Sequence, residues 1–245
     1  MFTASRSATI SNNTFVGNTA ADNGSAITTG YPGYPPAGPS SGSATIQGNT
    51  LSRHSGPSTI AVSDGNPTIQ QNNFVNNTAV YDLVNLNSSG TPAVDATNNW
   101  WGTTDTNAVQ TRIFDFTDDI GRGVVNASPL RSGFNLAAPL TPPTGLQITA
   151  GANTLNLKWT ANPESDVAGY KVYYGTTASV YAGTGATQGA SPIDAGNVTS
   201  FTLTGLAPGT YYVTVTAYDN GRDGTNDQTD GNESWFATVV SVTLP

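Results

Sequence analysis

The sequence predicts an all-β chain in which a solenoid of stacked coils precedes a β-sandwich. Three observations predict it. A short apolar and Asn-rich phrase recurs four times in the first hundred residues, a proline-rich segment follows near residue 140, and the remainder alternates apolar and polar residues between turns. A unit of roughly 20 to 25 residues cannot bury its own apolar side chains, so such units are expected to stack.

The repeat begins with Ile10, Ile46 and Ile69 and, in altered form, with Val94. The intervals are 36, 23 and 25 residues, and the longest fits one coil that carries an insertion of about 13 residues. Each repeat has a second apolar patch, as at residues 58–62. Short alternating strands separated by Gly, Asn, Ser and Pro place their inward side chains on those of the next coil, so columns of apolar residues are expected.

One asparagine in each repeat precedes an aromatic residue or leucine by two positions: Asn13, Asn49, Asn72 and Asn98. Side-chain amides stacked about 4.8 Å apart can hydrogen-bond one another and the backbone of a bend. Asn also tolerates the left-handed conformation that such corners need. We therefore predict a structural asparagine ladder.

The stretch from about residue 2 to residue 137 resembles the right-handed parallel β-helix repeat family. Residues 98–102, 113–116 and 124–130 are similar to the closing coil of many bacterial members. The resemblance implies that Trp100 and Trp101 cover the end of the apolar column, and we expect both to be buried.

The predicted domains are a parallel β-helix at 1–137, a Pro-rich hinge at 138–143 and a sandwich at 144–245. The sandwich resembles a fibronectin type III domain over nearly its whole length. By that resemblance Trp159 is the core tryptophan, and Tyr212 is the tyrosine whose hydroxyl bonds back to the backbone at a corner.

Composition excludes several functions. The net charge is −8 with 8 basic and 16 acidic residues, which is unlike a phosphate-binding surface, so no nucleic-acid partner is expected. The absence of cysteine excludes disulfides and thiolate chemistry. No apolar run reaches the roughly 18 residues of a membrane span. These features are typical of an exported bacterial protein, and we expect the C-terminal portion of a longer one.

An acidic, glycine-rich segment lies between the last two predicted strands and contains Asp219, Asp223, Asp227, Asp230 and Glu233. Such oxygen-rich loops can wrap Ca²⁺, so calcium is the one cofactor considered. The alternative is a solvated loop without a metal, because the spacing does not match an EF-hand.

Many parallel β-helices cleave polysaccharides, and Arg53 and His54 are the best catalytic candidates in the repeats. The competing interpretation is a histidine on the solvated surface. Tyr31 and Tyr34 lie on a proline-stiffened insertion that could present aromatic rings to a sugar or a neighbouring subunit. Whether the chain is an enzyme stays open, and the sequence favours a protein without catalytic activity.

We therefore predict an extracellular bacterial structural or adhesive surface protein, whose partners are copies of itself in a filament or matrix, or other surface proteins. The alternative is a polysaccharide-binding or polysaccharide-degrading β-helix module with the sandwich as spacer.

Overall fold

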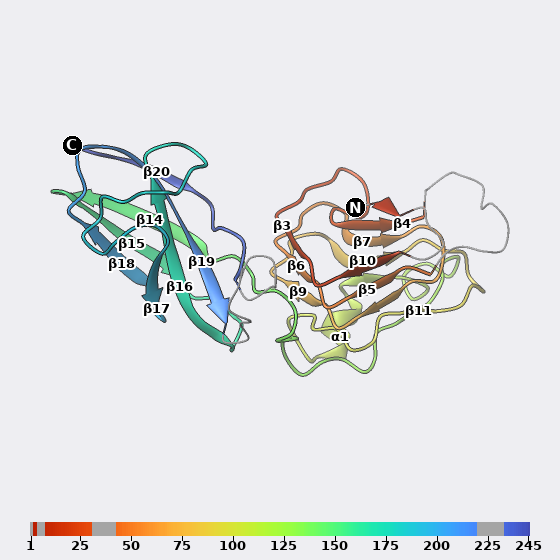
Figure 1. Cartoon of the computed structure of the whole chain (residues 1–245). Coiled ribbons are helices and arrows are strands. Elements are labelled where there is room, and N and C mark those ends of the chain that lie inside the picture. The colour runs from red at the N-terminus through yellow and green to blue at the C-terminus, as the bar shows by residue number, and fades with distance from the viewer. Residues whose placement is uncertain (1, 4–7, 31–42, 220–232) are drawn as a thin grey trace. The chain divides into compact units, whose positions relative to one another are not determined.

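The computed structural model describes residues 2–3, 8–30, 43–219 and 233–245. The chain separates into two compact units, Met1–Pro139 and Leu140–Pro245. Strands dominate both units, so the protein is all-β, and the one helix in the described residues is α1 (Thr106–Gln110) (Figure 1).

The N-terminal unit contains three parallel sheets to which successive passes of the chain contribute one short strand each. The first sheet runs in the order β1 (Phe2–Thr3), β4 (Ile27–Thr29), β7 (Ser58–Val62), β10 (Tyr81–Asn85) and β12 (Ile113–Phe114). The second has β2 (Thr9–Ser11), β5 (Thr45–Gln47), β8 (Thr68–Gln70), β11 (Val94–Asp95) and β13 (Val125–Asn126). The third has β3 (Thr14–Val16), β6 (Thr50–Ser52) and β9 (Asn73–Val75).

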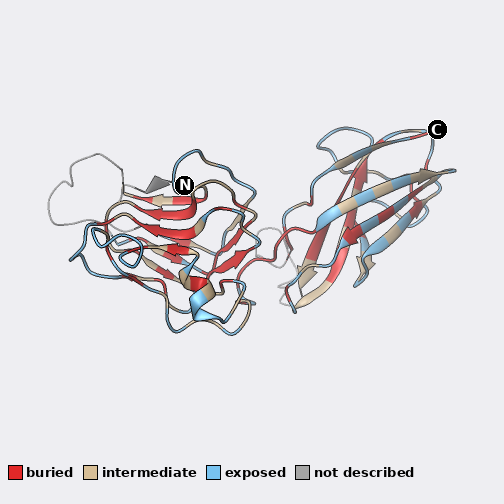
Figure 2. Ribbon diagram, turned by 180° about the vertical axis from the view of Figure 1, so that it is seen from behind, coloured by how far each residue is buried: buried red, intermediate tan, exposed pale blue. Residues whose placement is uncertain are grey.

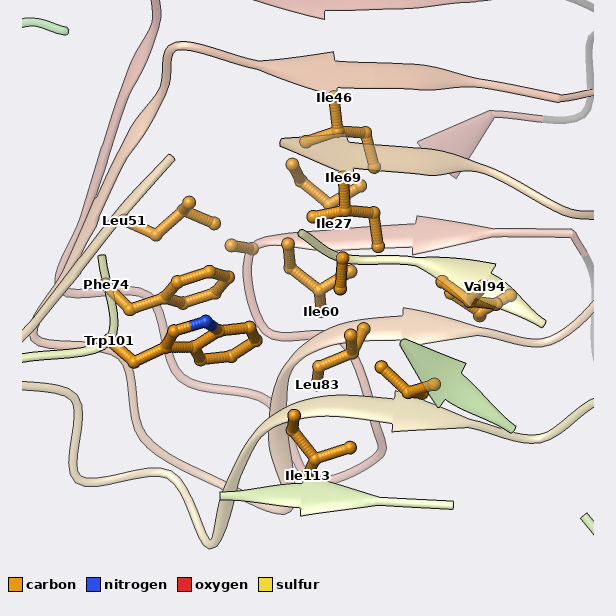
Figure 3. Packing of buried hydrophobic residues seen from close by; sticks show 14 of the residues in the cluster. Ile27, Ile46, Leu51, Ile60, Ile69, Phe74, Leu83, Val94, Trp101 and Ile113 are labelled. Carbon is orange, nitrogen blue, oxygen red and sulfur yellow. The ribbon is translucent and has the colours of Figure 1, made fainter. Parts of the chain in front are cut away.

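The strand registers place the apolar residues of successive repeats beside one another. Ile10 pairs with Ile46 and Ile46 with Ile69, while Leu51 lies between Phe15 and Phe74 in the third sheet. Figure 3 shows that Ile46, Ile69, Leu51 and Phe74 point into one core with Ile27, Ile60 and Leu83 of the first sheet. Stacking therefore buries side chains that no single repeat could cover.

The fourth repeat begins two residues later than the sequence predicts. Asp95 pairs with Thr68, so Ala96 and not Val94 takes the position opposite Ile69, and the interval is 27 residues. The prediction of Val94 was wrong because it followed side-chain size, whereas both Val94 and Ala96 are fully buried.

A left-handed corner occurs at the same place in four passes, and in the first three it precedes the strand of the third sheet. Asn12, Gly48, Gln71 and Asn98 have φ values of 55°, 64°, 57° and 57°. Positive φ disfavours β-branched residues and favours Gly and Asn, which explains the polar and glycine-rich letters at this position.

A buried aspartate fixes the closing segment of the N-terminal unit. The Asp115 carboxylate accepts hydrogen bonds from the backbone N–H groups of Val125 and Thr117 at 2.8 and 2.9 Å, and from the Thr117 hydroxyl at 2.7 Å. These bonds tie β13 to the turn after β12, so this acidic residue serves the backbone.

The C-terminal unit is a sandwich of two antiparallel sheets, as predicted. One contains β14 (Thr144–Gly151), β15 (Thr154–Thr160) and β18 (Ser200–Thr204); the other contains β17 (Ile193–Gly196), β16 (Val167–Gly175), β19 (Gly209–Asp219) and β20 (Val240–Leu244). Leu155, Leu157 and Trp159 are buried and alternate with residues of higher exposure along β15. Figure 2 shows buried and exposed colours alternating along strands of this unit. This alternation is the pattern of a sheet with one solvated face.

Candidate functional site

The asparagines of the N-terminal unit form a continuous ladder. The Oδ1 atom of Asn49 accepts from the backbone N–H of Asn13 at 2.9 Å, and Asn72 Oδ1 accepts from that of Asn49 at 2.9 Å. Asn99 Oδ1 accepts from the Asn72 N–H at 2.8 Å. The Nδ2 atoms of Asn49, Asn72 and Asn99 also donate to carbonyls of the preceding pass, those of Ile10, Ile46 and Ile69. These buried amides satisfy backbone groups that would otherwise be unpaired at the corner.

The ladder ends at Asn99 and excludes the predicted Asn98. Asn98 is exposed and occupies the left-handed corner, one residue before the ladder position. The sequence-based prediction assigned both roles to a single asparagine, whereas the chain uses two consecutive residues for them. The true signal is the 27-residue spacing from Asn72 to Asn99.

The two tryptophans differ in environment. Trp101 is 5% exposed, and its ring stacks on Phe74 with centroids 4.4 Å apart and planes 3° apart (Figure 3). Trp100 is only half-buried and contacts Phe134 at a centroid distance of 5.7 Å. The expectation that both are buried is thus wrong for Trp100. The ladder asparagine is Asn99 and not Asn98, so the core position two residues later is Trp101.

Arg53 and His54 lie at the second corner of their pass. Arg53 has a φ of 58°, and its equivalents Gly17 and Asn76 have φ values of 64° and 52°. The positive φ of Arg53 is therefore a feature of this corner in the repeat. His54 is fully buried, which corrects the expectation of a solvated histidine. Its Nε2 donates to the Phe15 carbonyl at 3.1 Å.

His54 takes the place of an asparagine in a second ladder. Its backbone N–H donates to Asn77 Oδ1 at 2.9 Å, and Asn77 Nδ2 donates to the Leu51 carbonyl as His54 Nε2 does to that of Phe15. Burial lowers the pKa of His54, outweighing the opposite influence of the Asn18 and Phe15 backbones and of Asp82. The described contacts therefore engage the imidazole in holding the corner.

A pocket of about 320 Å³ lies next to this second ladder, where the turn after β9 approaches α1. Phe74, Asp82 and Trp101 form its buried floor. The other lining residues are half-buried or exposed: Asn76, Asn77, Gly102, Thr103, Ala108, Thr111 and Arg112. Sequence reasoning missed this site, because it joins residues of two passes, and Asp82 and Arg112, which form its ion pair, belong to no motif.

An ion pair fixes one wall of the pocket. Arg112 Nε and Asp82 Oδ2 are 2.9 Å apart, and Asp82 Oδ1 accepts from Asn77 Nδ2 at 2.9 Å. The Arg112 guanidinium also donates to three backbone carbonyls, those of Asn77, Ala79 and Val80. The ion pair thus holds the turn at residues 77–80 against the segment that contains Arg112.

The sandwich contains a tyrosine corner, at Tyr211 and not at the predicted Tyr212. The Tyr211 hydroxyl donates to the Ala207 carbonyl at 2.9 Å, and the residue is buried, whereas Tyr212 is half-buried on the other side of β19. Trp159 is 3% exposed and packs against Tyr170 at a centroid distance of 5.4 Å. A buried strand tryptophan together with this corner is typical of immunoglobulin-like sandwiches.

Residues 141–230 match the family model of the fibronectin type III domain. This part of the chain is a fibronectin type III domain. Such domains are typical of surface, extracellular and carbohydrate-active proteins. None of the curated proteins matches the chain.

Solved structures similar to the chain include an Fn3-like protein from Clostridium thermocellum, with 26% identity and a TM-score of 0.32 over 44% of this chain and 96% of that one. The chicken CNTN1 FN1–FN3 domains have 17% identity and a TM-score of 0.34 over 43% and 31%. A β-1,2-glucanase from Parabacteroides distasonis has 23% identity and a TM-score of 0.31 over 43% and 13%.

Glu233 of the fibronectin type III domain is engaged within the domain. Its Oε2 lies 2.7 Å from Lys171 Nζ, and its Oε1 accepts from the Tyr173 hydroxyl at 2.7 Å and from the Thr216 hydroxyl. The residue is 6% exposed. The structure thus removes Glu233 from the predicted calcium ligands, because its carboxylate is committed to the sheet.

The remaining predicted ligands are only partly within the structure. Asp219 ends β19, and Asp223, Asp227 and Asp230 lie outside the described residues, as do Tyr31 and Tyr34. Within the described ranges, no three acidic or histidine side chains gather as a metal site would require. None of the helical segments in those ranges has the length and apolar character of a membrane span.

Proposed function

We propose that the N-terminal unit is a right-handed parallel β-helix and that the chain is a structural or adhesive part of an extracellular bacterial surface protein. Three parallel sheets filled in the same order by successive passes, with columns of apolar residues and an asparagine ladder, support the β-helix. Parallel crossovers are right-handed in nearly all proteins, which supports the hand. The fibronectin type III domain supports the extracellular location.

The observation that carries the structural role is how four buried titratable side chains are bonded. His54, Asp82 and Asp115 in the N-terminal unit each bond to backbone or side-chain groups that hold a corner or a turn. Glu164 does so in the sandwich, where it accepts from the backbone N–H and the hydroxyl of Thr141. Polar groups used in this way give a rigid and uniquely packed scaffold.

At the N-terminal end of the stack, we propose contact either with preceding coils of a longer chain or with a second copy of this chain. There β3 is the edge of its sheet, and each later asparagine of the ladder accepts through Oδ1 from the pass before it. No such bond reaches Asn13 Oδ1 from the described residues, and Asn13 is exposed. An edge strand of this kind can pair with another chain.

Electron microscopy of the purified chain tests this proposal. We expect filaments or ordered oligomers, and we expect Val16→Lys on β3 to remove them, because a charged edge resists pairing. Val80→Lys is the matched control, since Val80 is 62% exposed and outside the strands. Equal assembly of both variants would contradict pairing through β3.

The second candidate function is binding or cleavage of a polysaccharide, and the pocket beside Trp101 favours it. Pockets of 300 to 1,000 Å³ with aromatic side chains and a few polar groups are the usual form of small-ligand sites. Incubation with neutral and acidic polysaccharides, followed by assays for bound glycan, new reducing ends and unsaturated products, tests it. Absence of both binding and products across the panel would remove this candidate.

A further inference from the structure

The pocket beside Trp101 has two buried aromatic residues in its floor and polar residues at its rim. Phe74 and Trp101 are buried at 2% and 5% exposure, and both contribute to the lining. Asn76, Gly102 and Thr111 are exposed at the rim, so the pocket opens to solvent. Because the two rings stack on each other, they offer the ligand their edges and a compact apolar wall.

The charged residues of the pocket balance each other. Asp82 and Arg112 form the ion pair at 2.9 Å, and they are the charged residues among those that line the pocket. An anionic ligand would face the Asp82 carboxylate, and a cationic ligand would face the Arg112 guanidinium. The pair thus favours an uncharged ligand.

Hydrogen-bonding capacity remains on both members of the pair. Arg112 has five N–H donors, of which four are used: one on Asp82 and three on carbonyls. Asp82 Oδ2 accepts from Arg112 Nε and has a second lone pair. A donor and an acceptor held together by one ion pair match two adjacent hydroxyl groups, each of which both donates and accepts.

One further polar group of the lining, the exposed Asn76 amide at the rim, is available for a ligand, whereas the Trp101 indole N–H is buried away from solvent. The buried indole N–H of Trp101 has no hydrogen-bond partner in the described part of the chain. The Asn76 side-chain amide at the rim likewise makes no hydrogen bond to the described residues.

We propose that this pocket binds a single uncharged sugar unit at the end of a glycan chain, with adjacent hydroxyls on the Asp82–Arg112 pair and the apolar face against Phe74 and Trp101. The inference rests on the second candidate function and names its site and ligand class. Adjacent hydroxyls, apolar C–H groups and no charge are the properties that the lining selects.

A ligand titration tests the proposal with methyl glycosides of neutral hexoses and N-acetylhexosamines as probes. Intrinsic tryptophan fluorescence and saturation-transfer NMR give the dissociation constants, and a methyl glucuronide is the charged comparison. We expect binding of at least one neutral glycoside. Ala108→Phe fills the pocket from α1 and should weaken that binding by about tenfold or more.

Asn107→Phe is the matched control, because Asn107 lies on the same helix, is exposed and does not line the pocket. Thr111→Phe at the exposed rim serves as a second blocking variant if Ala108→Phe lowers the melting temperature. No neutral glycoside bound at millimolar concentration would overturn the proposal, as would glucuronide binding that equals the neutral binding. Polysaccharide binding that both blocking variants retain would overturn the site and leave the second candidate function standing.

Discussion

Asn98 and Asn99 are consecutive residues with opposite roles. Asn99 is fully buried, and its Nδ2 donates to the Ile69 and Ala96 carbonyls while its Oδ1 accepts from Asn72. Asn98 is exposed and occupies the left-handed corner, where its carbonyl accepts from the Gln71 N–H and its side chain donates to the neighbouring Thr97 hydroxyl. Local sequence cannot separate them, since both are followed by tryptophan within two positions and only the contact with the preceding pass tells them apart.

Asn99→Ala should therefore be strongly destabilising. It leaves buried backbone groups unpaired, at about 1–3 kcal/mol for each one in the free energy of unfolding. Asn98→Gly keeps the positive φ and should stay within about 0.5 kcal/mol of the unmodified chain. Urea unfolding measures both values, and similar losses in the two variants would show that the ladder does not end at Asn99.

His54 makes the stability of the N-terminal unit depend on pH. Burial lowers its pKa below the unfolded value of about 6.5, so the unfolded chain binds the proton more readily. The neutral imidazole's contribution to the free energy of unfolding is fully present above a pH of about 6.5 and is lost as the pH falls from there toward the lower folded pKa. Asp82 raises the His54 pKa and limits the loss.

His54→Asn is the informative variant, because Asn77 holds the equivalent position in the next pass. It should retain the ladder and remove the titration. We expect the unmodified chain to lose more unfolding free energy than the variant between pH 7 and about pH 5. Parallel pH profiles of the two proteins would contradict the assignment of a buried neutral imidazole.

At the scale of the strand, Tyr211 and Tyr212 are another consecutive pair that the sequence did not resolve. Tyr211→Phe should lower the unfolding free energy of the sandwich by about 0.5–1.5 kcal/mol, since it removes the bond to the Ala207 carbonyl. Tyr212→Phe should have a smaller effect. Thermal unfolding compares them, and a larger cost at Tyr212 would place the corner there.

The register of β11 is testable because the chain has no cysteine. Thr68 and Asp95 are direct partners, and neighbouring strands lie about 4.8 Å apart, within the range that a disulfide spans. Thr68→Cys with Asp95→Cys should cross-link under mild oxidation, whereas Thr68→Cys with Ala93→Cys should not. A reversed result, read on non-reducing gels, would restore the 25-residue spacing that the sequence suggested.

Much of the architecture could be predicted from sequence because its causes repeat. Ile10, Ile46 and Ile69 recur at the same place in each pass, and Leu155, Leu157 and Trp159 alternate along a strand. The pocket could not be predicted, because Asp82 and Arg112 are 30 residues apart and belong to no repeated phrase. Their pairing depends on how the closing segment lies against the last full pass.

For the whole molecule, buried polar groups maintain the architecture of both units. In the N-terminal unit they link successive passes through ladders. In the fibronectin type III domain, Glu233 links Lys171 and Tyr173 across the sheet. A chain in which such groups hold the backbone is suited to the structural role proposed above.

Light scattering of the purified chain over a range of micromolar concentrations tests that role most directly. Pairing through the edge of β3 predicts that the mean molar mass rises with concentration above that of the 25.2 kDa monomer. The rise should be absent in Val16→Lys and present in Val80→Lys. A monodisperse monomer at every concentration would contradict the proposal that the chain assembles with copies of itself.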